Sequence, residues 1–593
     1  MKITKPLIGL TAALALTVAP LTAVYAANES TAESSIRLAS AMDEIDTLNP
    51  FTAVFNEALI VLDYEYEPLA GITETGDYGG ILADDFKVDG TTWTYHIRDK
   101  ATWSDGKPVT ADDVVWTYEA VMNNKALQVA NGESVGNIEK VNAVDEKTVE
   151  IHTTAPTPLH PGILPIVPKH IWESIDKPAE YANTEGVVGS GPFIIEDYQQ
   201  GVSITLKSNP HYWRGKTGVD KLNIIGFKND DAAVLALRNG EIDMKGGLSS
   251  AQFDSLKSVK GIKDYRVTSK HFFNLTINGG WKTVDGKSFG TENPVLHDQA
   301  FRRAIGQAID RKVLLDRVIN GLGSQGPTIL PPGSPGGFYT DLPDAALPMG
   351  VDAAKKSLEA AGYTTDAQGN RLDKDGKPIT LRMMFNGGST ENLATSEFIE
   401  SWFKDLGIKM ELKNTNWDEM GELIPKGDYD TYIDGWGVSQ DPDYMLSINV
   451  CSVLPEKAGE SSSSQSGMCD PEYDKIFEAQ HTELDPAKRK ELVQQALQMI
   501  YEYGNTAMFY YDDNLGAYRS DRLENLVEVN GSPYNRFSIA QATIKGAGGS
   551  DAKGGDTGGM NGWLIGGGIV VVVLAAGGII LGARRKKSAD DRK

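Results

Sequence analysis

The sequence has very few cysteines: Cys451 and Cys469 are the only two in 593 residues. No cysteine follows the apolar run near the N-terminus, which excludes the thioether-linked lipid anchor of bacterial lipoproteins. In a protein outside the cell, an even pair 18 residues apart predicts one disulfide that closes a loop. A metal site or a catalytic thiol is the less favoured interpretation of this pair.

The sequence also has too few basic residues to balance its acids. It contains 57 Lys and Arg against 81 Asp and Glu, for a formal net charge of -24. A chain this acidic repels nucleic acid and anionic lipid surfaces, so we expect neither as a partner. The remaining composition, 40% hydrophobic and 23% charged, is globular and long enough for two to four domains.

Motifs for catalysis, metals and nucleotides are missing as well. The eight histidines show no metal-ligand spacing, and no Gly-x-Ser-x-Gly run is present. The glycines of the Gly-Ser-Gly-Pro run at 189–192 lack the Gly-Lys-Ser/Thr of a phosphate-binding loop. We therefore predict no enzyme activity, no cofactor and no metal. A surface hydrolase with a carboxylate pair stays open as an alternative of another class, as does an adhesin or sensor.

The two ends of the chain predict export and anchoring. Residues 1–26 have a basic start, an apolar middle and small residues before a cleavage point, as in a secretory signal peptide. Residues 563–583 carry no charge and precede four consecutive cations at 584–587, which predicts a transmembrane helix rather than a buried core helix. The Gly-rich segment 546–562 would be a linker, and 584–593 a cytoplasmic basic tail. We expect a single-pass protein of the cell membrane with its main body outside.

Strand-like and helix-like segments are interspersed between the two ends without a fixed repeat. Alternating or continuous apolar runs at 36–41, 222–227 and 508–517 predict strands. Apolar residues at helical spacing at 298–309, and the Asp-Pro start of 485–503, predict helices. The pattern indicates an α/β or α+β protein with several lobes.

One stretch, at 428–446, is the best candidate for a functional site. Alternation through Tyr429, Thr431 and Ile433 predicts a strand that breaks at Gly435. Trp436 and a polar loop containing two aspartates follow. Such a strand end could form the wall of a ligand cleft, and a buried tryptophan at the end of an ordinary strand is the alternative.

Five features in a fixed order give a more specific indication. They are the Trp-Ser-Asp-Gly-Lys-Pro run at 103–114, the Gly-Ser-Gly-Pro hairpin ending in Asn-Pro-His-Tyr-Trp at 189–213, the Arg-Arg-Ala-Ile and Ile-Asp-Arg run within 295–323, the Asp-Tyr-Asp, Gly-Trp and Asp-Pro-Asp motifs at 428–443, and the pair Cys451 and Cys469. Together they resemble the large solute-binding proteins of bacterial ABC importers, the dipeptide/oligopeptide-binding family (family 5). The resemblance covers about residues 36–519.

This resemblance implies a hinged, two-lobed fold similar to periplasmic binding proteins, with an extra inserted domain. The solute-binding region would be 36–545: lobe I at about 36–60, 188–292 and 507–545, the inserted domain at 61–187, and lobe II at 293–506. A monomer would capture oligopeptides or dipeptides between the lobes and deliver them to an ABC permease. An oligosaccharide or another small solute is the alternative ligand.

Several ligand-binding residues follow from the same resemblance. Trp417 and Trp436 match aromatics that flank the peptide in oligopeptide binders. Glu44 matches an acid near the ligand in the first lobe, and Asn274 falls where that lobe meets the peptide.

The family's peptide binders have an aspartate three residues after the matching Trp, which pairs with the α-ammonium of the ligand. This position is Ser439 here, and serine supplies no charge. Either Asp441 or Asp443 takes this role after a shift of the loop, or the ligand has no free amine there.

Overall fold

The computed structural model describes residues 33–42, 45–290, 293–342, 348–439, 441–460 and 462–546. The chain divides into two units, Met1–Ala547 and Gly548–Lys593, and all described residues belong to the first. The expected signal peptide, transmembrane helix and basic tail lie outside the described residues, as does the linker beyond Gly546. Within the described ranges, no helix combines the length and apolarity needed to cross a membrane.

The first lobe is built on a sheet in the strand order β11-β1-β10-β9-β8. β1 pairs in parallel with β10, and β8, β9 and β10 form an antiparallel set. The elements of this lobe are β1 (Ser35–Ser40), α1 (Asn56–Glu65), β8 (Phe193–Gln199), β9 (Ser203–Ser208), β10 (Lys221–Gly226), α5 (Asp230–Asn239), β11 (Met244–Lys245), α6 (Ser250–Leu256), β12 (Ile262–Thr268), β21 (Leu523–Glu524), α15 (Arg536–Gln541) and β22 (Thr543–Ile544).

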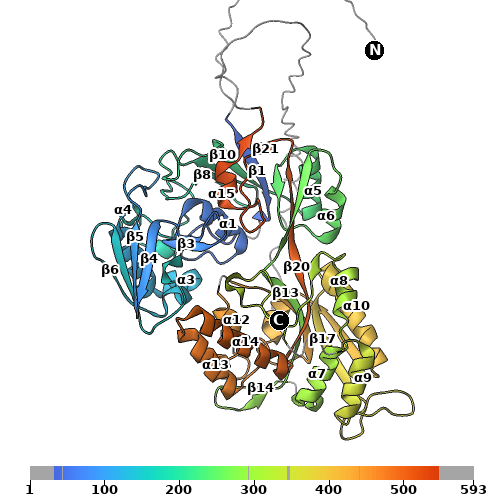
Figure 1. Cartoon of the computed structure of the whole chain (residues 1–593). Coiled ribbons are helices and arrows are strands. Elements are labelled where there is room, and N and C mark those ends of the chain that lie inside the picture. Colours follow the sequence, from blue (N-terminus) through green and yellow to red (C-terminus); the bar gives the residue numbers. More distant parts are fainter. Residues whose placement is uncertain are drawn as a thin grey trace, which may run out of the picture. The chain divides into compact units, whose positions relative to one another are not determined.

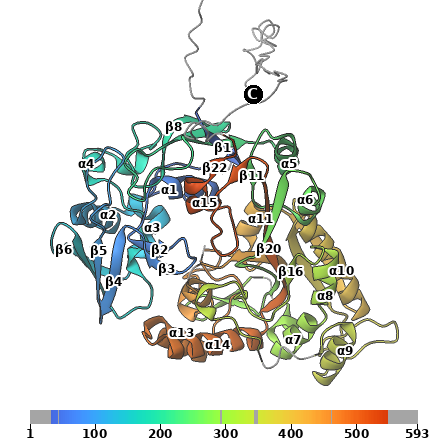
Figure 2. The same ribbon diagram turned by 45° about the horizontal axis from the view of Figure 1, so that its top comes forward.

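The inserted segment has its own four-stranded sheet in the order β4-β5-β7-β6. Figures 1 and 2 both show it beside the first lobe, away from α7 and α9. Its elements are β2 (Ala70–Ile72), β3 (Tyr78–Gly80), β4 (Ala83–Asp89), β5 (Thr92–Ile97), α2 (Ala111–Asn123), α3 (Gln128–Val135), β6 (Ile138–Ala143), β7 (Thr148–Thr153) and α4 (Lys169–Trp172). Its buried side chains, such as Trp93 and Val114, belong to the same continuous core as Ile36 and Leu222 of the first lobe. The insertion therefore enlarges the first lobe instead of packing around a separate core.

The second lobe is built on strands in the order β18-β17-β19-β13-β20. Its elements are β13 (His271–Ile277), β14 (Trp281–Lys282), β15 (Ser288–Phe289), α7 (Gln299–Gln307), α8 (Arg311–Arg317), β16 (Gly323–Ser324), α9 (Val351–Ala360), β17 (Thr380–Asn386), α10 (Thr390–Asp405), β18 (Lys409–Thr415), α11 (Trp417–Leu423), β19 (Thr431–Gly437), α12 (Asp443–Ser447), α13 (Pro471–Thr482), α14 (Pro486–Tyr503) and the first half of β20 (Thr506–Arg519). Asp485 caps α14 through the backbone N–H groups of Ala487 and Lys488, as its Asp-Pro start predicted.

Strand β20 connects the two lobes. Its first half pairs with β13, and its second half pairs with β11 and β12 of the first lobe. In Figure 1 it runs from the second lobe into the first as one long strand. One strand thus completes both sheets, and the two lobes share a continuous path of hydrogen-bonded strands.

The pairing of β13 differs from the expected lobe boundary. Residues 271–277 fall in the range 188–292 that we assigned to the first lobe. Instead β13 pairs with β19 and β20, and its side chains Leu275 and Ile277 pack in one core with Phe301 and Ile433. Asn274 therefore lies on the second lobe and not on the first. The boundary was missed because sequence patterns define a strand but not its partner.

The strand at the centre of the candidate stretch does not break at Gly435. Gly435 and Trp436 remain in β19, opposite Phe273 and Phe272 of β13. A Cβ at Gly435 would lie 2.8 Å from the Phe273 ring, so glycine allows the close contact of two paired strands. The alternation of residues along β19 did not distinguish a buried face from an exposed one, because β19 is a central strand whose two faces are both covered.

The Gly-Ser-Gly-Pro run leads into the β8–β9 hairpin, as predicted. A Cβ at Gly189 would lie 2.2 Å from the carbonyl oxygen of Glu65, and one at Gly191 equally close to that of Tyr64. Both glycines therefore serve the close approach of this run to the end of α1. Cys451 and Cys469 form the expected disulfide.

Candidate ligand-binding site

The candidate site begins with two pairs of residues that lie opposite each other on β13 and β19. Asn274 lies opposite Asp434, and Phe272 lies opposite Trp436. Directly opposed residues of an antiparallel pair point to the same face of a sheet. The side chains of these four residues therefore share one face, and the neighbouring residues Leu275 and Ile433 point to the other face, which α7 and α10 cover.

Asp434 is a buried carboxylate on this shared face. The residue is 8% exposed, and its carboxylate accepts hydrogen bonds from the Trp436 indole N–H at 2.8 Å and from the Gly435 backbone N–H at 2.9 Å. Burial raises the pKa of Asp434 to about 6, against the effect of these hydrogen bonds. Within the described residues it forms no ion pair, so its negative charge has no directly bonded cation.

Asn274 presents a second unsatisfied group beside Asp434. The residue is 2% exposed, and its Nδ2 donates to Thr276 Oγ1 at 2.9 Å. Its Oδ1 has no hydrogen-bond partner among the described residues. Buried polar atoms without a partner are uncommon in folded proteins and are often found where a ligand binds.

The two aspartates of the following loop are already paired. Arg489 donates from Nη1 and Nη2 to the two oxygens of Asp441, both at 2.6 Å. Asp443 Oδ1 accepts from Gln480 at 2.7 Å and contacts His481 Nδ1 at 2.8 Å, a contact that raises the pKa of His481. Arg489 therefore already compensates the charge of Asp441, and His481 lies beside the carboxylate of Asp443.

The loop with Asp441 also lies near the first lobe. His160, in the inserted segment, stacks on Tyr78 with ring centroids 4.1 Å apart. Burial lowers the pKa of His160 to about 4, and the charges of Asp441 and Arg489 contribute to this value in opposite directions. A charge changes the pKa of a neighbouring group most strongly when it is close, so this loop lies near His160 of the inserted segment.

The other expected ligand-binding residues are exposed or lie outside the described part of the chain. Trp417 starts α11 and is 51% exposed. Ser439 is an exposed residue just beyond β19. Glu44 falls outside the described residues. The structure therefore places Asn274 and Trp436 on one face of the sheet, whereas Trp417 and Ser439 lie at exposed positions.

Sequence reasoning missed three residues of this region: Asp434, Arg489 and His160. An acidic residue in the apolar part of a predicted strand was a usable signal for Asp434. Arg489 lies within a helix among other charged residues, and His160 lies in a Pro-rich loop, so neither differed from its background. Within the described residues, no group of three or more His, Cys, Asp or Glu side chains could hold a metal ion.

The fold and the polar face of β13 and β19 define a class of protein: a two-lobed α/β binding protein of the periplasmic type. More specifically, the chain belongs to the bacterial extracellular solute-binding proteins, family 5, since the model of that family's middle region matches residues 78–453.

Individual relatives agree with this membership. The periplasmic oligopeptide-binding protein OppA of Salmonella typhimurium is 25% identical over 514 residues, which cover 80% of this chain and 86% of the relative. The solved oligopeptide-binding protein AppA of Bacillus subtilis, in complex with a nonapeptide, has a TM-score of 0.67 at 21% identity and covers 86% of this chain and 98% of its own. A mannohexaose-bound periplasmic oligopeptide-binding protein of Thermotoga maritima has a TM-score of 0.68 at 20% identity, covering 87% and 99%. At these identities the solved structures show a common fold.

Proposed function

We propose that this protein is the extracellular binding component of an ABC importer and captures oligopeptides between its two lobes. The buried carboxylate of Asp434 carries the peptide assignment. A buried charge without a bonded cation is costly, and an α-ammonium group would compensate it. Family membership and the peptide-binding relatives support the same conclusion. The work of such a protein is binding and release, which requires no catalytic group.

Asp434 would then replace the charge that Ser439 lacks. Asp441 and Asp443 are less suited to this role because Arg489, Gln480 and His481 already bind them. Asn274 Oδ1 would accept a second hydrogen bond from the same ammonium, and Trp436 would form the apolar wall beside it. Trp417 and Glu44 remain proposed ligand contacts on the strength of the resemblance.

An oligosaccharide is the second candidate ligand. The exposed Trp417 and the partly buried Trp436 suit stacking against sugar rings, and one relative of the same fold was solved with mannohexaose. A sugar would leave the charge of Asp434 without a partner, so we place this candidate second.

Thermal shift with panels of ligands tests the proposal. Tri- to pentapeptides with a free N-terminus should stabilise the protein by RT ln(1 + [L]/Kd), about 2.7 kcal/mol at a hundredfold excess over Kd. The same peptides with an acetylated N-terminus serve as matched controls and should stabilise it far less. Stabilisation by neutral oligosaccharides and by no peptide would overturn the peptide assignment.

We further propose that the protein is exported through residues 1–26 and held in the membrane by residues 563–583. The uncharged length of the second segment and the cations at 584–587 support this topology. Close tethering would raise the effective concentration of the binding region near its permease. Removal of 563–593 should release the protein into the medium, as immunoblots of cells and medium would show. A truncated protein that stays with the membrane fraction would contradict the anchor.

A further inference from the structure

A cavity in the first lobe takes no part in the proposed ligand site. Its volume is about 390 Å³, which is within the range of cavities that bind small organic molecules. Three segments line it: the turn between β2 and β3, the connection from β9 to β10, and α15. The lining side chains that can bind a ligand are Glu74, Arg214, Lys216, Phe537 and Gln541.

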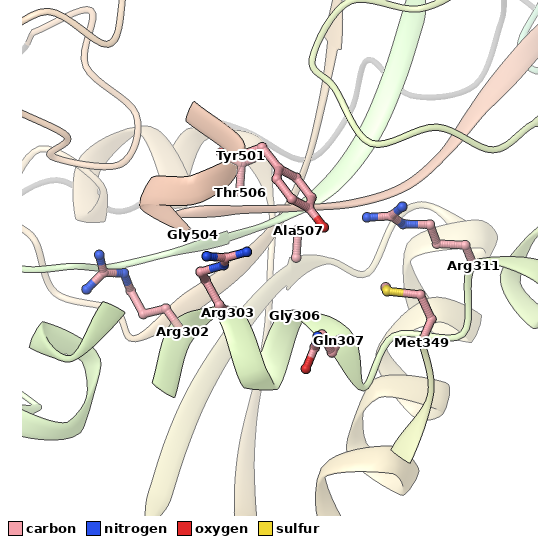
Figure 3. A pocket seen from close by; sticks show the side chains of 10 residues that line it. All are labelled: Arg302, Arg303, Gly306, Gln307, Arg311, Met349, Tyr501, Gly504, Thr506 and Ala507. Carbon is pink, nitrogen blue, oxygen red and sulfur yellow. The ribbon is translucent and has the colours of Figure 1, made fainter. Parts of the chain in front are cut away.

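A cavity in the second lobe, between α7 and the start of β20, is much smaller. Its volume is about 40 Å³, which is room for only a few water molecules. Figure 3 shows that the guanidinium group of Arg302 points away from those of Arg303 and Arg311. We therefore assign no ligand to this second cavity.

Arg214 is a cation of the larger cavity whose N–H groups are not used. It follows Trp213, the last residue of the Asn-Pro-His-Tyr-Trp run, and its guanidinium carbon lies 4.3 Å from the centroid of the Trp213 ring and 5.1 Å from that of Phe537. Ring faces attract the charge but leave the N–H groups in the guanidinium plane free. Arg214 forms no hydrogen bond and no ion pair with the rest of the described chain, and its Nε is buried. Such a group is uncommon in a folded protein unless a ligand or water binds it.

Glu67 is the buried acid whose charge acts on Arg214, but it bonds to other groups. Its carboxylate accepts hydrogen bonds from the indole N–H of Trp213 at 2.6 Å and from the hydroxyl of Tyr212 at 3.4 Å. Burial raises the pKa of Glu67, and the charge of Arg536 opposes this shift more strongly than the charge of Arg214 does. The donors of Arg214 therefore remain available to a ligand in the cavity.

The remaining polar groups divide the cavity into a donor side and an acceptor side. Lys216, from the same connection as Arg214, is exposed and forms no ion pair within the described ranges, although the charge of Asp220 interacts with it. On the other two segments, Gln541 Nε2 donates to Glu74 Oε2 at 3.5 Å. This long bond leaves oxygen atoms of both Glu74 and Gln541 as acceptors.

We propose that this cavity binds a small hydroxylated carboxylate with a single negative charge, such as a sugar acid. The carboxylate would pair with Arg214 and Lys216, and the hydroxyl groups would donate to Glu74 and Gln541. Two cations and one acid leave one positive charge in the lining, which one carboxylate neutralises. An amino-acid zwitterion would leave this charge uncompensated, and a phosphate monoester would exceed it.

This cavity is separate from the proposed peptide site. Its lining comes from the first lobe and the inserted segment, whereas Asn274, Asp434 and Trp436 lie on strands of the second lobe. Loss of binding in the cavity should therefore leave peptide binding unchanged, and either proposal can fail without the other.

Calorimetric titration of the full-length protein with sodium D-glucuronate, at constant ionic strength in chloride, tests the site. We expect a saturable isotherm with one ligand per chain and no binding of D-glucose, which has a similar ring without the charge. Arg214→Gln should weaken glucuronate binding by about tenfold or more, because it removes hydrogen bonds from a charged donor. Arg238→Gln is the matched control: Arg238 is exposed on α5 of the same lobe, and its loss changes the net charge equally without affecting the cavity.

Lys216→Gln, at an exposed position, provides a second variant if Arg214→Gln fails to fold, and it should also weaken binding. Glucuronate binding that survives both variants would place the sugar acid elsewhere and overturn the proposal. Equal binding of glucose and glucuronate would show that the carboxylate is not recognised. Tighter binding of alanine or of glycerol 3-phosphate than of glucuronate would contradict the single negative charge. Absence of binding to both D-glucuronate and D-gluconate would also overturn the proposal.

Discussion

Replacement of Asp434 by asparagine is expected to weaken the binding of peptides with a free α-amino group by roughly 100-fold. Truncating one partner of a buried charge pair costs about 2–5 kcal/mol, and about 3 kcal/mol corresponds to this factor in Kd. Asparagine preserves the size of the side chain and an oxygen that can accept from the Trp436 indole. Isothermal calorimetry with a free peptide and with its N-acetylated form measures the effect.

The N-acetylated peptide is the control for this variant, because it has no positive charge at its N-terminus. Its affinity should change by much less between the unmodified protein and the Asp434→Asn variant. If both peptides lose affinity equally, Asp434 supports the fold of the site without pairing with the ammonium. If neither loses affinity, the amine binds elsewhere.

Binding of amine peptides should also depend on pH through this group. Burial raises the pKa of Asp434 to about 6, so the carboxylate is ionised at pH 7 and largely protonated at pH 5. An ammonium ligand needs the ionised form. Affinity should therefore fall as the pH is lowered from 7 to 5, and this fall should be absent in Asp434→Asn.

A carboxylate introduced at Ser439 also tests whether a negative charge binds the amine of the ligand. Ser439→Asp places a carboxylate where the family's peptide binders have one, at an exposed position of this chain. It should raise the affinity for amine peptides, and in the Asp434→Asn background it should restore part of the lost affinity. Rescue by Ser439→Asp but not by Ser439→Asn would show that charge, and not an added hydrogen bond, is the cause.

Replacement of Glu65 by glutamine is expected to remove a large pH dependence of stability. Glu65 is fully buried at the end of α1, and burial raises its pKa to about 8. Its Oε1 accepts from the Ile195 backbone at 2.9 Å, and its Oε2 has no partner among the described residues. The folded protein therefore holds a proton on this group at neutral pH that the unfolded chain releases.

The sign of this effect follows from proton linkage. A carboxyl group with a raised pKa in the folded state stabilises the fold most at low pH, and the stabilisation declines as the pH rises from about 4.5 to 8. One such proton gives a slope of about 1.4 kcal/mol per pH unit in this window. Urea unfolding of the unmodified protein and of Glu65→Gln at several pH values measures the difference. Parallel curves for the two proteins would show that Glu65 is ionised in the folded state.

Local patterns predicted most of the elements but not their assembly. The Asp-Pro start predicted α14, and the Gly-Ser-Gly-Pro run predicted the hairpin of β8 and β9. Caps, turns and apolar spacing are properties of a few neighbouring residues, so they can be read along the chain. The partners of a strand are not local, and for this reason β13 was placed in the wrong lobe.

The candidate site was only partly predictable for the same reason. Trp436 stood out as an aromatic residue beside a glycine and a polar loop, and motif order indicated the family. Asp441 and Asp443 attracted attention as acids in a loop, although Arg489 and His481 come from helices far along the chain to bind them. Which carboxylates are already paired depends on contacts between distant segments.

The amino-acid sequence alone indicated a two-lobed solute-binding protein, its family and its disulfide. The motifs and the cysteine spacing that indicate these features each involve only a few neighbouring residues. The tertiary structure decided that Asp434 is buried beside Asn274 without a bonded cation, whereas Asp441 is paired with Arg489. Both outcomes depend on burial and on long-range pairing. Burial changes the cost of a charge by several kcal/mol, and only the folded chain determines which charges are buried together.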